Sequence, residues 1–476
     1  MPDRPNVLVI LSDQHRHDGL SCAGSVVRTP HLDRLAARGV RCRRAYTTSP
    51  VCVPARASMY AGLYPHQTHV LDNSSWLSWG SDTWASQLRD AGYYTAHIGE
   101  AHQRSTPHLR DNEPYLESLG FSFVHEVTGQ WSTLYHDSYM TDEWKEKGVY
   151  EQFCDDYRER QASVDSDNAR EAVDKCTWAS PLDVEDHMDS YVGRQAVDFL
   201  EGYDRDAPFA MFLGIPGPHG PMDPPGEYAD MYDPGDVETA IPPSEPPQWV
   251  PDDIVESVKN DGWTPSYWTP ALAAEYRASY YGKISLIDHW VGNILNTLER
   301  RGMLDNTIII YTADHGEFAG DYGRFGKGTF HEESAGIPLI AAGPGISEDA
   351  VIDGLASLID IYPTLLDFAG VEGGTTCGTS LVPLLEGSSE SVQEAVYGVI
   401  GHRAMIATEQ HTYGIRADGH GYVLWDHERS PEQEVLIGHP AYESVADELR
   451  DRLHTFYHKT STRFRRADDH YVVEDP

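Results

Sequence analysis

The stretch Cys52-Val53-Pro54-Ala55-Arg56-Ala57-Ser58, followed closely by Gly62-Leu63-Tyr64-Pro65-His66, is the one around which the rest of the chain is organised. Pro54 suits the first turn of a helix, where a missing backbone N–H costs nothing. Cys52 would then lie at the helix N-terminus, where unpaired N–H groups and the helix dipole favour an anion. Arg56 follows four residues later and projects from the same helix face. The spacing predicts an anion site where a nucleophile, a positive helix end and a cation meet.

Two acidic turns elsewhere in the chain each follow an apolar run of strand length. Asn6–Leu11 and Thr307–Thr312 read as strands buried on both faces of a parallel sheet. Because ligands gather at the carboxyl ends of parallel strands, the two turns can share one crevice. Aspartates that cap helices are the alternative interpretation, but the Cys52 stretch favours a divalent metal site. The candidate ligands are Asp13, Gln14, Asp314 and His315.

The order of elements predicts the architecture. Strands and helices alternate over residues 1–374, which favours an α/β sandwich with a large, mostly parallel sheet flanked by helices. Residues 103–190 have weak periodicity, and we expect an insertion over the sheet edge that shapes the substrate site. Residues 375–476 contain short strand-like segments and a helix near Val445–His458. They predict a small C-terminal α+β subdomain with an antiparallel sheet and a terminal helix.

The composition is strongly acidic. Asp and Glu number 75 against 36 Lys and Arg, giving a formal net charge of −39. Such a surface makes nucleic acid and anionic membranes poor partners, and it is typical of a salt-adapted, halophilic protein. The six cysteines are too sparse for a disulfide framework. No apolar run reaches membrane-spanning length and no signal segment is visible, so we expect a cytoplasmic protein.

Several segments carry a resemblance to a known family: Cys52–Arg56 as C-x-P-x-R, Asn6–Gln14, Thr29–Ala36, Pro218-His219-Gly220-Pro221, and Asp314–Ser334 with its Gly326-Lys327-Gly328. Together they resemble the type I sulfatases, the formylglycine-dependent branch of the alkaline phosphatase superfamily. The similarity spans nearly the whole chain and is weakest over residues 103–190.

The resemblance implies an alkaline-phosphatase-like fold and hydrolysis of a small-molecule or glycan sulfate ester. The nucleophile would be formylglycine, made from Cys52 by a maturation enzyme. A divalent metal ion would be held by the four candidate ligands, with Ca²⁺ favoured and Mg²⁺ or Mn²⁺ as alternatives. The implied roles of the other residues are charge stabilisation by Arg56, proton transfer near the leaving oxygen by His219 or Lys327, release of the product by His102, and substrate contact by Asn73.

One position departs from the family pattern. Many sulfatases carry G-K-x-H where this chain has Gly99-Glu100-Ala101-His102, so a carboxylate replaces a sulfate-binding lysine. Glu100 could pair with Arg56, recognise a cationic substrate group, or point away. The missing lysine and the metal turns also resemble phosphonate monoester and phosphodiester hydrolases of the same superfamily, which are the alternative. A silent binding protein that keeps the fold without modifying Cys52 is a further alternative.

Overall fold

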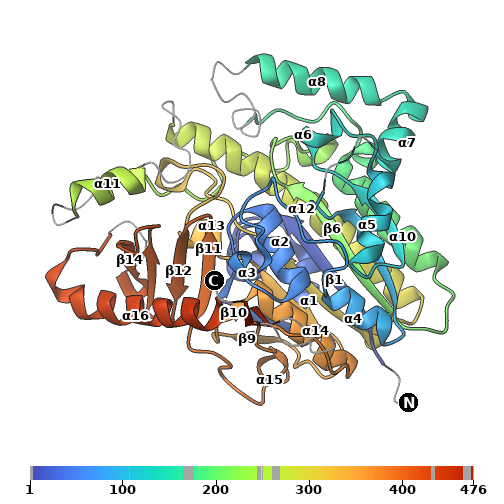
Figure 1. The fold of residues 1–476 in the computed structure, drawn as a ribbon. Coiled ribbons are helices and arrows are strands. Elements are labelled where there is room, and N and C mark those ends of the chain that lie inside the picture. Colours follow the sequence, from blue (N-terminus) through green and yellow to red (C-terminus); the bar gives the residue numbers. More distant parts are fainter. Residues whose placement is uncertain are drawn as a thin grey trace.

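The computed structural model is built around an eight-stranded sheet (Figure 1). It describes residues 4–104, 106, 108–163, 176–243, 248, 250–259, 268–429, 435–461, 463–464 and 473–474. The first five strands in the sheet order run parallel. β8 is antiparallel to both of its neighbours, β7 and β2, and β9 pairs in parallel with β2. The order is β5 (Phe123–Val127), β4 (Tyr94–Glu100), β6 (Phe209–Pro218), β1 (Asn6–Asp13), β7 (Thr307–Ala313), β8 (Leu339–Ala342), β2 (Gly39–Cys42) and β9 (Ala350–Ile352).

Both faces of this sheet are covered by helices because the central strands are apolar on both sides. In β1, Val7, Val9 and Leu11 face one core, while Leu8 and Ile10 face the other. The first core contains side chains of α2 (Cys52–Ala61), α4 (Trp84–Asp90) and α14 (Ile361–Ala369). The second contains those of α1 (Pro30–Ala37), α10 (Met188–Gly202) and α12 (Pro270–Arg300). The predicted α/β sandwich with a mostly parallel sheet is therefore confirmed.

The region from 103 to 190 differs in one respect from the expected insertion over the sheet edge. It supplies α5 (Glu113–Ser118), α6 (Gln130–Thr133), α7 (Tyr139–Lys147) and α8 (Tyr150–Ser163), and it also supplies β5. That strand pairs with β4 and is therefore part of the sheet. It lacks an apolar run because it carries His125 and Glu126 and is only half-buried over its first three residues. Residues 164–175 lie outside the described residues.

A second, antiparallel sheet occupies the C-terminal part of the chain and lies beside the central sheet (Figure 1). Its strands are β11 (Val396–Ile400), β12 (Arg403–Ala407), β13 (His411–Ile415) and β14 (Gly421–Asp426), and α16 (Glu443–Thr460) packs on it. The sequence pattern did not predict β12. Tyr46 and Tyr64 join this core from the N-terminal half, and the Val399 N–H donates to Thr48 O at 2.8 Å. The two parts of the chain thus share a buried interface.

The remaining short elements are α3 (Pro65–Thr68), α11 (Asp252–Lys259), α13 (Glu332–Ala335), α15 (Val382–Leu385), β3 (Ala45–Tyr46), β10 (Ala356–Ser357), β15 (Arg463–Phe464) and β16 (Val473–Glu474). Among the described residues, no helix combines the length and apolarity that crossing a membrane requires. All six cysteines are free thiols.

Candidate active site

Cys52 is the first residue of α2, as the sequence predicts, and its side chain is buried. Its Sγ lies 3.1 Å from His315 Nε2, 3.2 Å from Lys327 Nζ and 3.9 Å from an Asp13 carboxylate oxygen. Burial, followed by the Asp13 carboxylate, raises the pKa of this thiol well above its usual range. Since the thiolate is the reactive form of cysteine, the unmodified side chain is a poor nucleophile here.

The two acidic turns meet because their strands are neighbours. β1 and β7 pair in parallel with Ser12 opposite Ala313, so Asp13 and Asp314 emerge side by side. Ligand atoms of Asp13, Cys52, Asp314 and His315 all lie within 4.8 Å of one another. Burial and the Asp314 carboxylate raise the pKa of Asp13 well above its usual range. A bound cation would relieve that repulsion, so this donor set fits a metal ion.

The imidazole of His315 is held in an orientation that suits a ligand. Nδ1 lies 3.0 Å from Gly316 O, so a proton on Nδ1 leaves Nε2 with its lone pair facing the carboxylates. Nε2 is 3.5 Å from Asp314 and 3.6 Å from Asp13. Burial lowers the pKa of His315 to about 3, which keeps the ring neutral.

Gln14 completes the predicted ligand group, and its orientation depends on Glu317. Gln14 has a left-handed backbone (φ 69°), and its N–H donates to Asp314 at 3.0 Å. Its amide nitrogen donates to Glu317, while Lys327 Nζ donates to its amide oxygen at 2.6 Å. The other oxygen of buried Glu317 accepts from the N–H groups of Ala319 and Gly326. Glu317 thereby turns the amide oxygen toward the site.

Arg56 is fully buried among three carboxylates. Its guanidinium donates to Asp13 and Asp314, each at 2.9 Å, and lies 3.0 Å from Glu100 Oε2. The second oxygen of Glu100 accepts from the Gly129 N–H at 2.8 Å. Of the three alternatives for Glu100, the structure therefore shows the pair with Arg56. A planar, five-donor guanidinium is suited to fixing several carboxylates at once.

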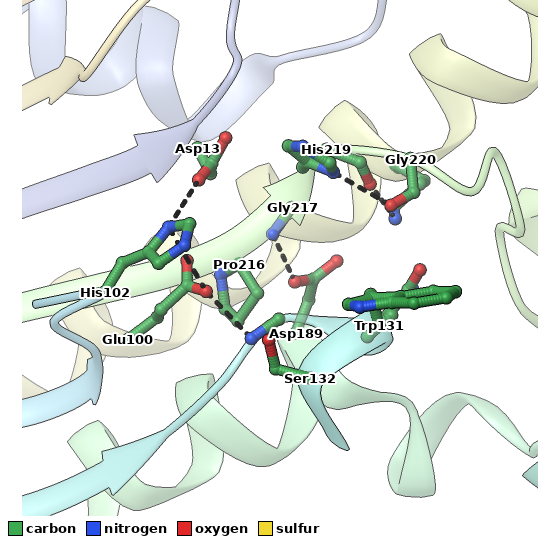
Figure 2. A pocket seen from close by; sticks show the side chains of 13 residues that line it. Asp13, Glu100, His102, Trp131, Ser132, Asp189, Pro216, Gly217, His219 and Gly220 are labelled. Atoms are coloured by element: carbon green, nitrogen blue, oxygen red, sulfur yellow. Dashed lines mark hydrogen bonds and ion pairs between the residues drawn. The ribbon is translucent and has the colours of Figure 1, made fainter. Parts of the chain in front are cut away.

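A pocket opens beside this cluster, and Figure 2 shows its lining. His102 lies at one end, with Nδ1 4.0 Å from Asp13 and 3.8 Å from Glu100. Burial lowers the pKa of His102. His219 lies across the pocket from His102, and its carbonyl oxygen accepts from the ammonium of buried Lys283 at 2.7 Å.

Asn73 has a position of its own at the start of α2. Its side-chain oxygen accepts from the Val53 N–H at 3.0 Å, and it therefore caps the helix whose own N-cap residue, Val51, has no side-chain acceptor.

The structure thus brings together Asp13, Gln14, Cys52, Arg56, Glu100, His102, Asp314, His315 and Lys327, with His219 on the adjoining pocket wall. The predictions missed Glu317, although it directly follows the Asp314-His315-Gly316 turn.

Comparison with known proteins identifies the class. The Sulfatase family model matches residues 5–371, and the model described as N-sulphoglucosamine sulphohydrolase, C-terminal, matches residues 320–459. An arylsulfatase from Clostridium perfringens is 31% identical over 457 residues, covering 90% of this chain and 87% of that protein. A choline-sulfatase from Rhizobium meliloti is 28% identical over 407 residues, covering 81% and 72%.

Solved structures share the fold. The phosphonate monoester hydrolase of Agrobacterium radiobacter superposes with a TM-score of 0.78 at 24% identity, covering 99% of this chain and all of that one. A structure in complex with its substrate D-glucosamine-2-N,6-O-disulfate gives 0.72 at 21% identity, covering 96% and 98%. The chain belongs to the sulfatase family. It is accordingly an enzyme of the sulfuric ester hydrolase class, in a family that generally uses a metal ion and formylglycine.

Proposed function

We propose that this protein hydrolyses a sulfate monoester, with formylglycine at position 52 as nucleophile and a divalent metal ion beside it. The observation that carries the proposal is the meeting of Cys52 with Lys327 and with the Asp13, Asp314 and His315 group at the N-terminal end of α2. The names of the similar proteins, which include an N-acetylglucosamine-6-O-sulfatase, support a small-molecule or glycan sulfate ester as the substrate.

The sequence motif around Cys52 and the protonated state of its thiol support its conversion to formylglycine. The C-x-P-x-R signature is intact, and the buried thiol is held in its unreactive protonated form. The hydrated aldehyde would supply two hydroxyls on one carbon, one to attack sulfur and one whose deprotonation releases sulfate. Function would then require a formylglycine-generating enzyme as a maturation partner.

The metal would be held by Asp13, Gln14, Asp314 and His315. Three of the four offer oxygen atoms, which suits Ca²⁺ or Mg²⁺, and the imidazole also permits Mn²⁺. We favour Ca²⁺. Such an ion would offset the buried carboxylates and stabilise negative charge on the substrate.

The remaining side chains act around the formylglycine at position 52 and the metal ion. Arg56 fixes the carboxylates of Asp13 and Asp314 and adds positive charge under the nucleophile. Burial opposes the charge of Lys327, but the nearby carboxylates of Asp13 and Asp314 help to raise its pKa. It therefore stays charged, 3.2 Å from the nucleophile position. Lys327 and His219 are the candidates for protonating the leaving oxygen.

Proton removal during product release is assigned to His102. Its lowered pKa leaves the ring neutral, and a neutral imidazole can accept a proton. Asn73 is assigned a contact to a nonbridging substrate oxygen through its amide nitrogen, since its oxygen is engaged by α2.

A second candidate is the hydrolysis of phosphonate monoesters, favoured by Glu100 in place of a lysine. The test is a paired rate comparison on matured protein in high salt, with 4-nitrophenyl sulfate and 4-nitrophenyl phenylphosphonate. The two substrates share a leaving group, so their ratio reports the preferred reacting centre. We expect sulfate to be preferred, and a clear preference for the phosphonate would establish the second candidate instead.

Peptide mass spectrometry of the segment containing Cys52 addresses the silent-protein alternative. We expect formylglycine at position 52 after expression in a host that can form it. A purely unmodified cysteine from such a host, together with no turnover of either substrate, would overturn both catalytic proposals.

A further inference from the structure

Asp189 is a buried carboxylate on the pocket wall that the proposed reaction does not use. It lies in the first turn of α10, is 2% exposed, and accepts the Gly217 N–H through Oδ1 at 2.8 Å. No donor among the described residues hydrogen bonds to Oδ2, and His187 Nδ1 lies 3.6 Å from it. Asp189 lines the same pocket as Asp13, so it can face a substrate held at the nucleophile.

Among the described residues that line the pocket, no lysine or arginine pairs with this carboxylate. Lys283 also lines the pocket, but its ammonium donates to His219 O, to Pro221 O and to Asp223 at 2.7, 3.1 and 3.2 Å. The two carboxylate oxygens of Asp223 also accept from the Gln130 amide nitrogen, at 2.9 and 3.1 Å. The positive charge of Lys283 is therefore directed to Asp223.

An aromatic ring flanks the same space. Trp131 is half-buried at the start of α6 and lines the same pocket as Asp189, and both side chains are labelled in Figure 2. Its ring packs against Tyr135 and Tyr157, with centroids 5.5 and 6.0 Å away. The face of an indole attracts cations. A carboxylate oxygen to which no described residue donates and the face of an indole are both suited to a positively charged group that carries N–H donors.

We propose that Asp189 and Trp131 form a subsite for a protonated amine on the alcohol part of the substrate. This rests on the proposed function, since the sulfate end would be held at Cys52. The ammonium would donate to Asp189 Oδ2 and lie against Trp131. Glu100 is excluded from this role, because its two oxygens are already engaged by Arg56 and Gly129. The preferred substrate class is therefore a sulfate ester of an amino alcohol.

The test compares substrates of equal size that differ in one charge: 4-(aminomethyl)phenyl sulfate against 4-ethylphenyl sulfate, and 2-aminoethyl sulfate against propyl sulfate. For each pair, kcat/KM for the amine is divided by that for its neutral partner at pH 7 in high salt. The same ratio is measured for Asp189→Asn. Comparing the wild-type ratio with the variant ratio cancels the difference in reactivity between the two leaving groups. We expect the wild-type ratio to exceed that of the variant by about 10-fold or more in at least one pair, as for a lost charged hydrogen bond.

The control is Glu372→Gln, which removes the same charge from an exposed position. Its ratios should match the wild type, so a fall there would assign the preference to the overall charge and overturn the subsite. Trp131→Leu provides a second variant if Asp189→Asn does not fold, and it should lower the ratio as well. Equal ratios in wild type and variants for both pairs would overturn the proposal.

The outcome also separates the subsite from the proposed function. Turnover of 4-nitrophenyl sulfate with unchanged ratios would sustain the function and refute the subsite. Absence of sulfate turnover would refute the function. The subsite would then be judged from the same pairs prepared as phenylphosphonate monoesters, with the same criterion applied to their ratios.

Discussion

Replacing Glu100 by lysine tests the interpretation of the site most directly, since it introduces the residue that many sulfatases carry. The Glu100 carboxylate lies 3.0 Å from the Arg56 guanidinium, and both side chains are buried. At an effective dielectric constant of about 20, such a pair attracts by about 5 kcal/mol. Lysine would replace this attraction by repulsion and would also remove the acceptor for the Gly129 N–H.

We therefore expect Glu100→Lys to lower the free energy of unfolding by at least about 3 kcal/mol, the low end for breaking a buried ion pair, because Arg56 keeps two other carboxylates. Glu100→Gln should lose less, since it keeps an acceptor for Gly129. Urea unfolding at pH 7 in high salt measures both, and kcat/KM for 4-nitrophenyl sulfate should fall in parallel for Glu100→Lys.

A matched control is available in the neighbouring strand. Burial raises the pKa of Glu126 to about 8, so this carboxyl is mostly uncharged at pH 7 and Glu126→Gln should change stability little. Wild-type stability together with a higher kcat/KM for Glu100→Lys would refute the reasoning, because it would mean that lysine is accommodated and binds sulfate as in relatives.

Three further predictions concern the nucleophile, the metal and acid stability. Cys52→Ala should abolish turnover while retaining metal affinity by calorimetry; near-normal rates would remove the nucleophile assignment. Glu317→Gln should weaken metal binding by about 10- to 100-fold, because the Gln14 amide loses its orienting acceptor; unchanged affinity would contradict this. Burial lowers the pKa of His97 from 6.5 to about 3, so stability from its neutral form is present above pH 6.5 and declines as pH falls. Between pH 7 and pH 5 the wild type should lose about 2 kcal/mol more than His97→Phe in urea unfolding, and parallel losses would exclude His97 as the cause.

The sequence was sufficient to predict those parts of the fold that depend on strong local patterns. Asn6–Leu11 and Thr307–Thr312 are apolar throughout because helices cover both faces of their strands, so their pairing in one parallel sheet could be expected. The helix start at Cys52 followed from Pro54. By contrast, β5 was not predicted, because an edge strand that is half-buried needs no continuous apolar run.

The candidate site also divides into residues that the sequence could place and residues that only the structure places. Residues at the ends of buried strands could be placed together because the topology of a parallel sheet brings them to one edge. The partners of Glu100 could not be derived, since three orientations were compatible with the sequence and only the structure shows Arg56 and Gly129 beside it. Asp189 could not be predicted because its proposed role depends on an oxygen to which no described residue donates a hydrogen bond, which no sequence pattern reveals.

The charges around position 52 give a physical reason for a carboxylate at position 100. When all are ionised, Asp13, Glu100 and Asp314 provide three negative charges, and Arg56 and Lys327 provide two positive ones. A divalent ion at the proposed metal site would change this balance from one negative to one positive charge, and a singly charged sulfate ester would then make it neutral. Lysine at position 100, which binds sulfate in many sulfatases, would leave two positive charges with the same substrate bound. A carboxylate at this position thus matches the site to a monoanion, and a protonated amine beside Asp189 would extend the same neutrality along the pocket.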